Sequence, residues 1–363
     1  MKKNALYIVL LFICMLPLNA QTSVSPYRPG ITQEGITYFL PSTGFHITMT
    51  ATRTTYTPGE FALYGEYFLR LKDVTMEAYD KWELQEVKIT PFGEADTTKA
   101  YTIQLNPKTS APLVGLAPDG RLLSINATPA QLSQFPAAKT VEPIVDDNNG
   151  LLNSDYKNSE ILSAGSKRKM AELAAAEIYD IRENRALLAK GQADFMPKDG
   201  EQLRLMFESL DKQEATLLKL FTGTKKSEKH TITISFVPKG ETEDHVIARF
   251  SKHVGFVDAD NLIGAPIYVS ITDLHSLPAE VIDPNAKKNK KKENLDLRYT
   301  IPGKGNIKVY TLENDFTNVT FPMSQFGRIE HLGGELFNKK FTTRVTLSPE
   351  TGGILRIDAD IAN

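Results

Sequence analysis

Two apolar stripes at helical spacing in residues 166–223 constrain the fold of this chain more than any other pattern. Ser166 is a residue type that caps helix N-termini, and Gly191 is one that ends helices. Asp199 and Gly223 mark the start and end of a second helix in the same way. The first stripe comprises Met170, Leu173, Ile178, Ile181 and Leu188, and the second comprises Leu203, Met206, Leu210, Leu217 and Phe221. Because each stripe covers one side only, we expect two antiparallel helices that pack on each other and on a β layer.

The stretch 21–126 has a strand pattern. From Phe45 to Thr52, apolar residues alternate with histidine and threonine, which is typical of a half-buried antiparallel strand. The aromatic spacing from Phe61 to Leu71 predicts one short helix that lies over these strands. Pro118-Asp119-Gly120 stands between two short apolar runs and predicts a hairpin. These patterns together predict an N-terminal β-rich domain over 21–126.

The remaining stretches complete the expected domain organisation. Residues 127–165 contain several prolines and no sustained period, so we expect a linker or long loop. Residues 229–363 return to strand patterns and predict a C-terminal β-rich domain, in which the five lysines within 287–292 predict a protruding loop. The expected fold class is α+β, with two β-rich units of antiparallel, sandwich-like sheets and an antiparallel helical hairpin (166–223) between them.

A short motif recurs in the two β-rich stretches. Tyr38-Phe39-Leu40-Pro41 and Tyr299-Thr300-Ile301-Pro302 each precede a strand, and each stretch closes on a hairpin with a glycine turn. Two related β units would explain both features. Chance recurrence would also explain them, because tyrosine and proline both suit strand ends. Both interpretations stay open at this point.

The first twenty residues have the form of an export signal. Lys2 and Lys3 precede an apolar stretch over 5–18, and Ala20 provides a small residue at a cleavage site, so we expect a signal peptide over 1–20. The apolar stretch is shorter than the roughly 20 residues that span a bilayer. Lipidation at Cys14 is less favoured, because Leu11-Phe12-Ile13 lacks the small residue that should precede a lipidated cysteine. We therefore expect an exported chain that does not span a membrane after cleavage.

The composition without residues 1–20 excludes several classes of protein. Cys14 is the only cysteine, so the mature chain has no disulfide and no thiolate metal site. Residues 1–20 include two lysines and no acid, and 40 basic and 44 acidic side chains remain. This near balance gives no electrostatic reason to expect nucleic acid as a partner. About 340 residues are enough for two or three compact units.

Motifs that carry chemistry are missing from the sequence. No Gly-x-Ser-x-Gly elbow, phosphate-binding glycine loop or helical histidine pair is present. Asp258-Ala259-Asp260-Asn261 begins like a calcium loop but lacks the later ligands, which favours a turn. The aromatic residues between Tyr64 and Trp82 favour core packing over sugar stacking. We therefore assign no catalytic, cofactor-binding or metal-binding residue, and no cofactor.

Several segments resemble a family of uncharacterised envelope or secreted proteins of Bacteroidota, catalogued as a domain of unknown function. The segments that carry the resemblance are Tyr38–Pro41, Tyr56–Gly59, Ala171–Arg182, Leu220–Gly223, Tyr299–Pro302 and Pro322–Gly327. The resemblance spans nearly the whole mature chain. It implies a periplasmic or outer-membrane-associated protein, with secretion as a further option, and it implies no activity. In such bacteria Asp96-Thr97-Thr98 fits the acceptor pattern for O-glycosylation, with Thr97 as the attachment site.

Two function classes remain. The first is an exported, non-catalytic interaction or scaffold protein whose partner is an envelope protein or glycan, and the missing motifs favour it. The second is a periplasmic hydrolase acting on glycan or peptide, with carboxylates that meet only in the folded chain. A deep pocket with two facing acids and aromatic walls would indicate the hydrolase. An exposed apolar patch would indicate the interaction protein.

Overall fold

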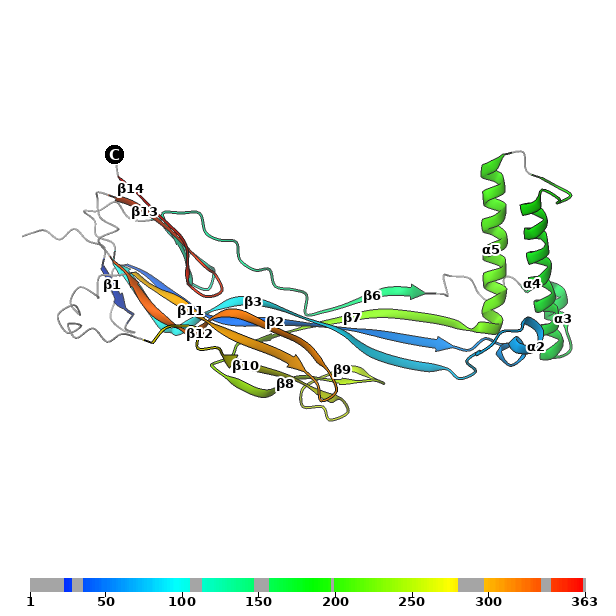
Figure 1. The fold of residues 1–363 in the computed structure, drawn as a ribbon, viewed down its shortest axis with the longest axis horizontal. Coiled ribbons are helices and arrows are strands. Elements are labelled where there is room, and N and C mark those ends of the chain that lie inside the picture. The colour runs from blue at the N-terminus through cyan, green and yellow to red at the C-terminus, as the bar shows by residue number, and fades with distance from the viewer. Residues whose placement is uncertain are drawn as a thin grey trace, which may run out of the picture.

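The structure is a computed structural model that describes residues 23–27, 35–104, 113–146, 157–196, 199–279, 297–333 and 341–361. The expected signal peptide over 1–20, including Cys14, and the lysine run within 287–292 lie outside the described residues. The described part is elongated (Figure 1). A β body occupies one end, a β stalk extends from it, and a helical subdomain occupies the other end.

The stalk belongs to a five-stranded antiparallel sheet, here called the long sheet. Its order is β1 (Ser23–Pro26), β3 (Tyr79–Gln104), β2 (Ile36–Thr57), β7 (Thr224–Phe236) and β6 (Lys139–Asp146). Hydroxyl groups bond across β2 and β7: Thr48 with Thr233 at 3.0 Å, and Thr50 with Thr231 at 3.3 Å. Such cross-strand pairs stabilise the face of a sheet that does not pack on a second sheet.

A second sheet packs face to face on the long sheet and forms the β body. Its order is β12 (Asp315–Leu332), β11 (Leu297–Tyr310), β10 (Ala265–Asp273), β8 (Thr242–Ser251) and β9 (Gly255–Val257). The two sheets share one apolar core, to which the long sheet contributes Phe45, Ile47, Met49 and Val87 and the second sheet contributes Ile267, Val269, Ile307 and Val309. The apolar residues of the alternating pattern from Phe45 to Thr52 therefore face this core.

A third, four-stranded sheet covers the end of the β body. Its order is β14 (Ile354–Ile361), β13 (Phe341–Leu347), β5 (Leu122–Ile125) and β4 (Val114–Leu116). The hairpin expected around Pro118-Asp119-Gly120 is the β4–β5 hairpin. A separate core beneath this sheet joins Val345 and Leu347 to Tyr38 and Leu297 of the other two sheets.

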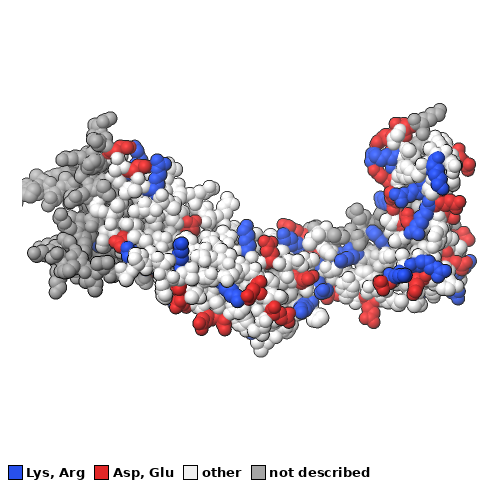
Figure 2. Space-filling model, viewed as in Figure 1, with Lys and Arg blue, Asp and Glu red and all other residues white. Residues whose placement is uncertain are grey.

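The helical subdomain is built on the expected hairpin. Its elements are a short 3-10 helix (Ala62–Tyr64), α2 (Gly65–Leu69), α3 (Ser159–Ser163), α4 (Lys167–Lys190) and α5 (Gly200–Thr222). The Ser166 and Asp199 side chains accept bonds from backbone N–H groups at the two helix starts, and Gly191 and Gly223 are the C-caps, as expected. Charged side chains crowd this end of the molecule (Figure 2).

The subdomain has an apolar core of its own. Phe61, Leu69, Ile178 and Phe221 are among its buried residues. The short helix expected over the strands belongs to this core, because Leu69 lies in one buried cluster with residues of α4 and α5 and not in the cores of the β body. The segment 127–165 supplies α3 to the same core through Ile161, and it supplies β6 to the edge of the long sheet.

The repeated motif makes the same backbone contact in both halves of the chain. The Phe39 N–H donates to the Gly120 carbonyl oxygen at 3.0 Å, and the Thr300 N–H donates to the Gly352 carbonyl oxygen at 3.1 Å. Both glycines lie in hairpin turns and have positive φ, +84° and +70°. The Tyr38 hydroxyl also accepts from the Arg298 N–H at 3.0 Å, which joins the two motifs. These matching contacts favour two related β units over chance recurrence.

The expected fold class, α+β with β-rich units and a helical hairpin, is confirmed. Strands from the two β-rich stretches share sheets, since β2 pairs with β7 and β5 pairs with β13. Among the described helices, none is both long enough and apolar enough to cross a bilayer.

Candidate functional site

Thr97, the expected glycan acceptor, lies on a bulge in β3. Phe39 of β2 pairs with Ala100, and the next residue, Leu40, pairs with Asp96. Residues 97–99 therefore have no partner residue on β2 and are displaced from the ladder. The Thr97 side chain is exposed.

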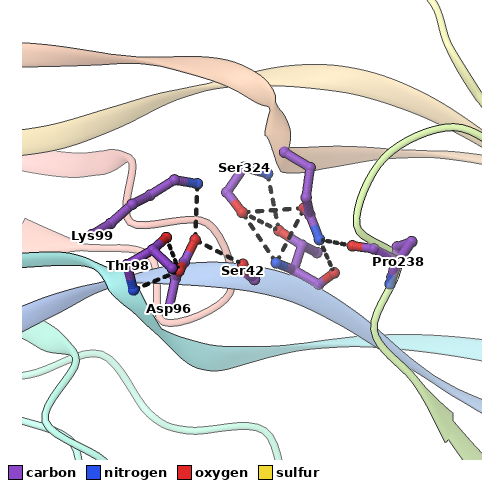
Figure 3. Close-up of polar contacts among 8 residues, drawn as sticks. Ser42, Asp96, Thr98, Lys99, Pro238 and Ser324 are labelled. Carbon is purple, nitrogen blue, oxygen red and sulfur yellow. Dashed lines mark hydrogen bonds and ion pairs between the residues drawn. The ribbon is translucent and has the colours of Figure 1, made fainter.

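The Asp96 carboxylate holds this bulge in shape (Figure 3). Its Oδ1 accepts from the Thr98 N–H at 3.0 Å and the Thr98 hydroxyl at 2.6 Å, while its Oδ2 pairs with the Lys99 Nζ at 3.1 Å. Burial raises the pKa of Asp96, but the hydrogen bonds from Thr98 and Lys99 outweigh burial and hold that pKa below its ordinary value.

Replacing Asp96 by asparagine should lower the free energy of unfolding by about 0.5–1 kcal/mol at pH 7, the size of a partly exposed ion pair. The pKa of Asp96 is depressed in the folded chain, so its contribution is present above the ordinary carboxyl pKa. The difference between wild type and D96N should disappear as the pH falls through the folded-state pKa. Urea unfolding at neutral and acidic pH measures this. Asp315→Asn, which removes the carboxylate of a more exposed ion pair with Lys308, is the control.

A second polar cluster in Figure 3 joins the two large sheets. The buried Thr43 of β2 donates its N–H to the Ser324 hydroxyl at 3.1 Å, and the Ser324 N–H donates to the Thr43 hydroxyl at 3.0 Å. The Gln325 amide donates to the carbonyl oxygens of Thr43 at 2.7 Å and Pro238 at 2.8 Å. Each of these four bonds joins a backbone group of one segment to a side chain of another segment that is distant in the sequence. The cluster is therefore a structural junction.

A cleft of about 640 Å³ opens where the second sheet ends and the stalk begins. We call it the Trp82 cleft. Three separate segments supply most of its lining: residues 81–84 of β3, residues 250–253 at the end of β8, and residues 311–316 around the β11–β12 turn. Its apolar lining includes Leu84, Phe250 and Phe316, and its polar lining includes Lys81, Glu83, His253, Glu313 and Asn314. The cleft therefore combines an apolar interior with polar groups of both charges.

Trp82 anchors the cleft and is itself only 9% exposed. The backbone N–H of Trp82 donates to the Lys252 carbonyl oxygen at 2.9 Å. A Cβ at Gly255 would lie 2.7 Å from the indole ring, so only glycine lets the β8–β9 turn pack here. The His230 ring lies 4.5 Å from the indole ring, and the Arg53 guanidinium lies 5.6 Å from it. Trp82 thus packs in the interior, as expected, and fixes the turn that borders the cleft. The expected core packing is wrong for Tyr67 and Tyr79 of the same aromatic stretch, which are 63% and 41% exposed.

Asp80 holds the Arg53 guanidinium in place beside Trp82. The Arg53 Nε donates to Oδ1 at 3.1 Å and Nη2 donates to Oδ2 at 2.6 Å. This hydrogen bonding lowers the pKa of Asp80 below its ordinary value. The ion pair joins β2 to β3 on the stalk side of the cleft.

The turns that border the cleft carry exposed aliphatic side chains. Leu312 is 84% exposed in the β11–β12 turn, and Leu262 and Ile263 are 81% and 68% exposed between β9 and β10. Val254, in the β8–β9 turn, is 53% exposed. Lys252 Nζ and Glu313 Oε2 lie 3.6 Å apart and link two of these turns. Aliphatic groups gathered on turn tips are typical of a contact surface.

Sequence reasoning did not find this surface. The only feature of the sequence that points to this surface is an aliphatic residue inside a turn pattern, as in Thr311-Leu312-Glu313-Asn314. The residues come from separate parts of the chain, so only the fold brings them together.

The acidic segment that begins like a calcium loop is a turn in the structure. Asp258 to Asn261 form a turn in which the Asn261 N–H donates to the Asp258 carbonyl oxygen at 3.0 Å, which favours the turn over a calcium loop. Among the described residues, no three His, Cys, Asp or Glu side chains are grouped as a metal site would require.

Comparison with known proteins identifies the family. Residues 34–355 match the model of a family described as a domain of unknown function (DUF4831), and the chain belongs to that family. The expected resemblance to an uncharacterised family is therefore confirmed. No curated protein and no solved structure matches the chain.

Proposed function

We propose that this member of the DUF4831 family is an exported, non-catalytic interaction protein of a bacterial cell envelope, and that the Trp82 cleft receives a protein partner. The observation that carries the proposal is the exposure of Leu312 and Ile263, 84% and 68%, which both line a cleft with an apolar interior. Exposed apolar surface costs free energy in water, at about 25 cal/mol per Å², and a partner that covers it removes that cost.

The shape of the molecule supports a scaffold role. The helical subdomain and the third sheet lie at opposite ends of the long strands, with β8 and β9 between them (Figure 1). The helical subdomain has its own core, so it can keep its fold while the β body is engaged. Such an arrangement suits a protein that holds two partners apart.

The place of action follows from the leader pattern of residues 1–20. In our proposal those residues direct export, and the mature chain acts in the periplasm or at the outer membrane, or is secreted. Bacteroidota origin and the identity of the partner belong to the same proposal.

Thr97 is the proposed glycan acceptor. Its exposure on a bulge, with Asp96 turned to the Thr98 backbone, supports access by a transferase. Intact-mass measurement of the native protein should show an added sugar mass that Thr97→Ala removes. Thr57→Ala changes another exposed threonine of the long sheet and should keep the added mass. An unmodified wild-type mass would refute the assignment.

A photoreactive amino acid at position 312 tests the proposed interaction in intact cells. We expect one dominant protein adduct from position 312, and the same adduct from position 263. The control is position 63, since Leu63 is 67% exposed but lies in the helical subdomain. The proposal fails if all three positions give the same adducts, or if positions 312 and 263 give none.

The hydrolase remains the second candidate because Glu83 and Glu313 line the same cleft as Phe250 and Phe316. It predicts that the purified protein cleaves glycan, peptide or peptidoglycan fragments, and that Glu83→Gln and Glu313→Gln each abolish cleavage. Our proposal predicts no turnover of any of these substrates. Turnover that survives both substitutions would place the activity outside this cleft.

A further inference from the structure

The strands at the ends of the three sheets differ in how well they are protected from pairing with another chain. An unpaired edge strand offers its N–H and C=O groups to any extended segment, and proteins block this with short strands or proline. The end strands β1, β4 and β9 have four, three and three residues. The end strands β6 and β12 contain Pro143 and Pro322. Among the end strands of the described sheets, only β14 has neither of these two protections, since it has eight residues and no proline. It does have a bulge at Leu355, and its regular ladder with β13 runs from Arg356 to Ile361.

The strands β3 and β8 are edges over part of their length, and both are interrupted. β3 contains Pro91, and its Trp82 N–H already donates to Lys252. In β8, Asp244 has a positive φ of +48°, which breaks the extended ladder. In the described part of the chain, β14 has backbone pairing with β13 alone.

The side chains of β14 divide into a charged row and an aliphatic row. Arg356 and Asp358 lie two residues apart, so they project to one face, and their side chains form an ion pair at 2.6 Å. Ile357 is 42% exposed, although Val345, its partner on β13, is fully buried. Leu355, 61% exposed, is the bulged residue and has no partner on β13. The core beneath the third sheet therefore ends at an open aliphatic edge.

The charge order of β14 is complementary to itself in one antiparallel register. With Ile357 opposite Ile357 of a second copy, each Arg356 lies opposite an Asp358 of the other copy. Shifting the two-fold axis by one residue puts Arg356 opposite Arg356, or Asp358 opposite Asp358, which is destabilising. Opposite charges thus select a single register, and that register also covers the exposed aliphatic row.

We propose that β14 is a self-association edge, at which two copies of this chain pair their β14 strands antiparallel with Ile357 opposite Ile357. The pairing continues the third sheet from one copy into the other. It uses backbone bonds for affinity and the Arg356 and Asp358 pairs for register. This inference is independent of the Trp82 cleft, which involves other strands.

Analytical ultracentrifugation of the mature protein over a wide concentration range tests the proposal. The wild type should show reversible monomer–dimer association. Arg356→Asp places like charges opposite each other, and so does Asp358→Arg, so each single variant should be monomeric at concentrations where the wild type is dimeric. The matched control pair is Arg53→Asp and Asp80→Arg, which breaks an ion pair in the stalk and should leave association unchanged.

An equal mixture of the R356D and D358R chains separates association from folding. The ion pair within each chain stays broken in the mixture, but every cross-copy pair is again of opposite charge, so the mixture should form a heterodimer. The proposal is overturned if the wild type is monomeric throughout, if the single variants associate as the wild type does, or if the mixture stays monomeric. The unfolding midpoints of the four substituted chains, R356D, D358R, R53D and D80R, show whether each variant is folded.

Discussion

Replacing Phe221 by alanine should destabilise the helical subdomain by about 3–5 kcal/mol, the usual cost of removing a buried phenylalanine. Phe221 is fully buried, and its ring lies 5.6 Å from that of Phe61. Because this core is separate from the core between the two large sheets, the loss should be local. Hydrogen exchange measures it: protection should fall in α4 and α5 and persist in β10 and β11.

The control for this prediction is Leu205→Ala on the same helix. Leu205 is 53% exposed, so its removal should change the free energy of unfolding by less than about 0.5 kcal/mol. Equal loss of protection in α5 and β11 upon Phe221→Ala would contradict the separation of the two cores.

Replacing Thr43 by valine should lower the free energy of unfolding by about 2–4 kcal/mol, because two buried groups lose their partners. The Thr43 hydroxyl accepts from the Ser324 N–H and donates to the Glu350 carbonyl oxygen, each at 3.0 Å. Valine keeps the volume of threonine but can neither accept nor donate these bonds. Urea unfolding measures the loss.

Thr48→Val is the matched control for Thr43→Val. The Thr48 hydroxyl bonds that of Thr233 at 3.0 Å on a half-buried face of the long sheet, where water can replace it. We expect a change of less than about 1 kcal/mol. Equal effects of the two substitutions would show that the junction at Thr43 does not hold the sheets together.

The sequence predicts the parts of this fold that depend on local rules. Ser166, Gly191, Asp199 and Gly223 are caps of α4 and α5, because capping is decided by the residue and its immediate neighbours. The alternation from Phe45 to Thr52 correctly predicts a strand with one face in the core.

Local rules do not predict contacts between segments that are distant in the sequence. The pattern from Phe61 to Leu71 shows an apolar stripe, but it does not show which element the stripe packs on. The expected packing is on the strands, whereas the structure shows packing in the core that includes α5. The alternation of β3 is interrupted at the bulge of residues 97–99, so one strand of 26 residues looks like separate pieces in the sequence. The Trp82 cleft depends entirely on which loops meet.

The most direct test of the proposed function measures the yield of the adduct from position 312 in intact cells. The yield is compared before and after charged residues are placed in the turn between β9 and β10. Leu262→Glu together with Ile263→Glu should lower that yield by about tenfold or more, since charges at a desolvated contact are strongly unfavourable. Leu205→Glu, on α5, should leave the yield unchanged. An undiminished adduct in the doubly substituted protein, with its unfolding midpoint unaltered, would contradict a partner seated at the Trp82 cleft.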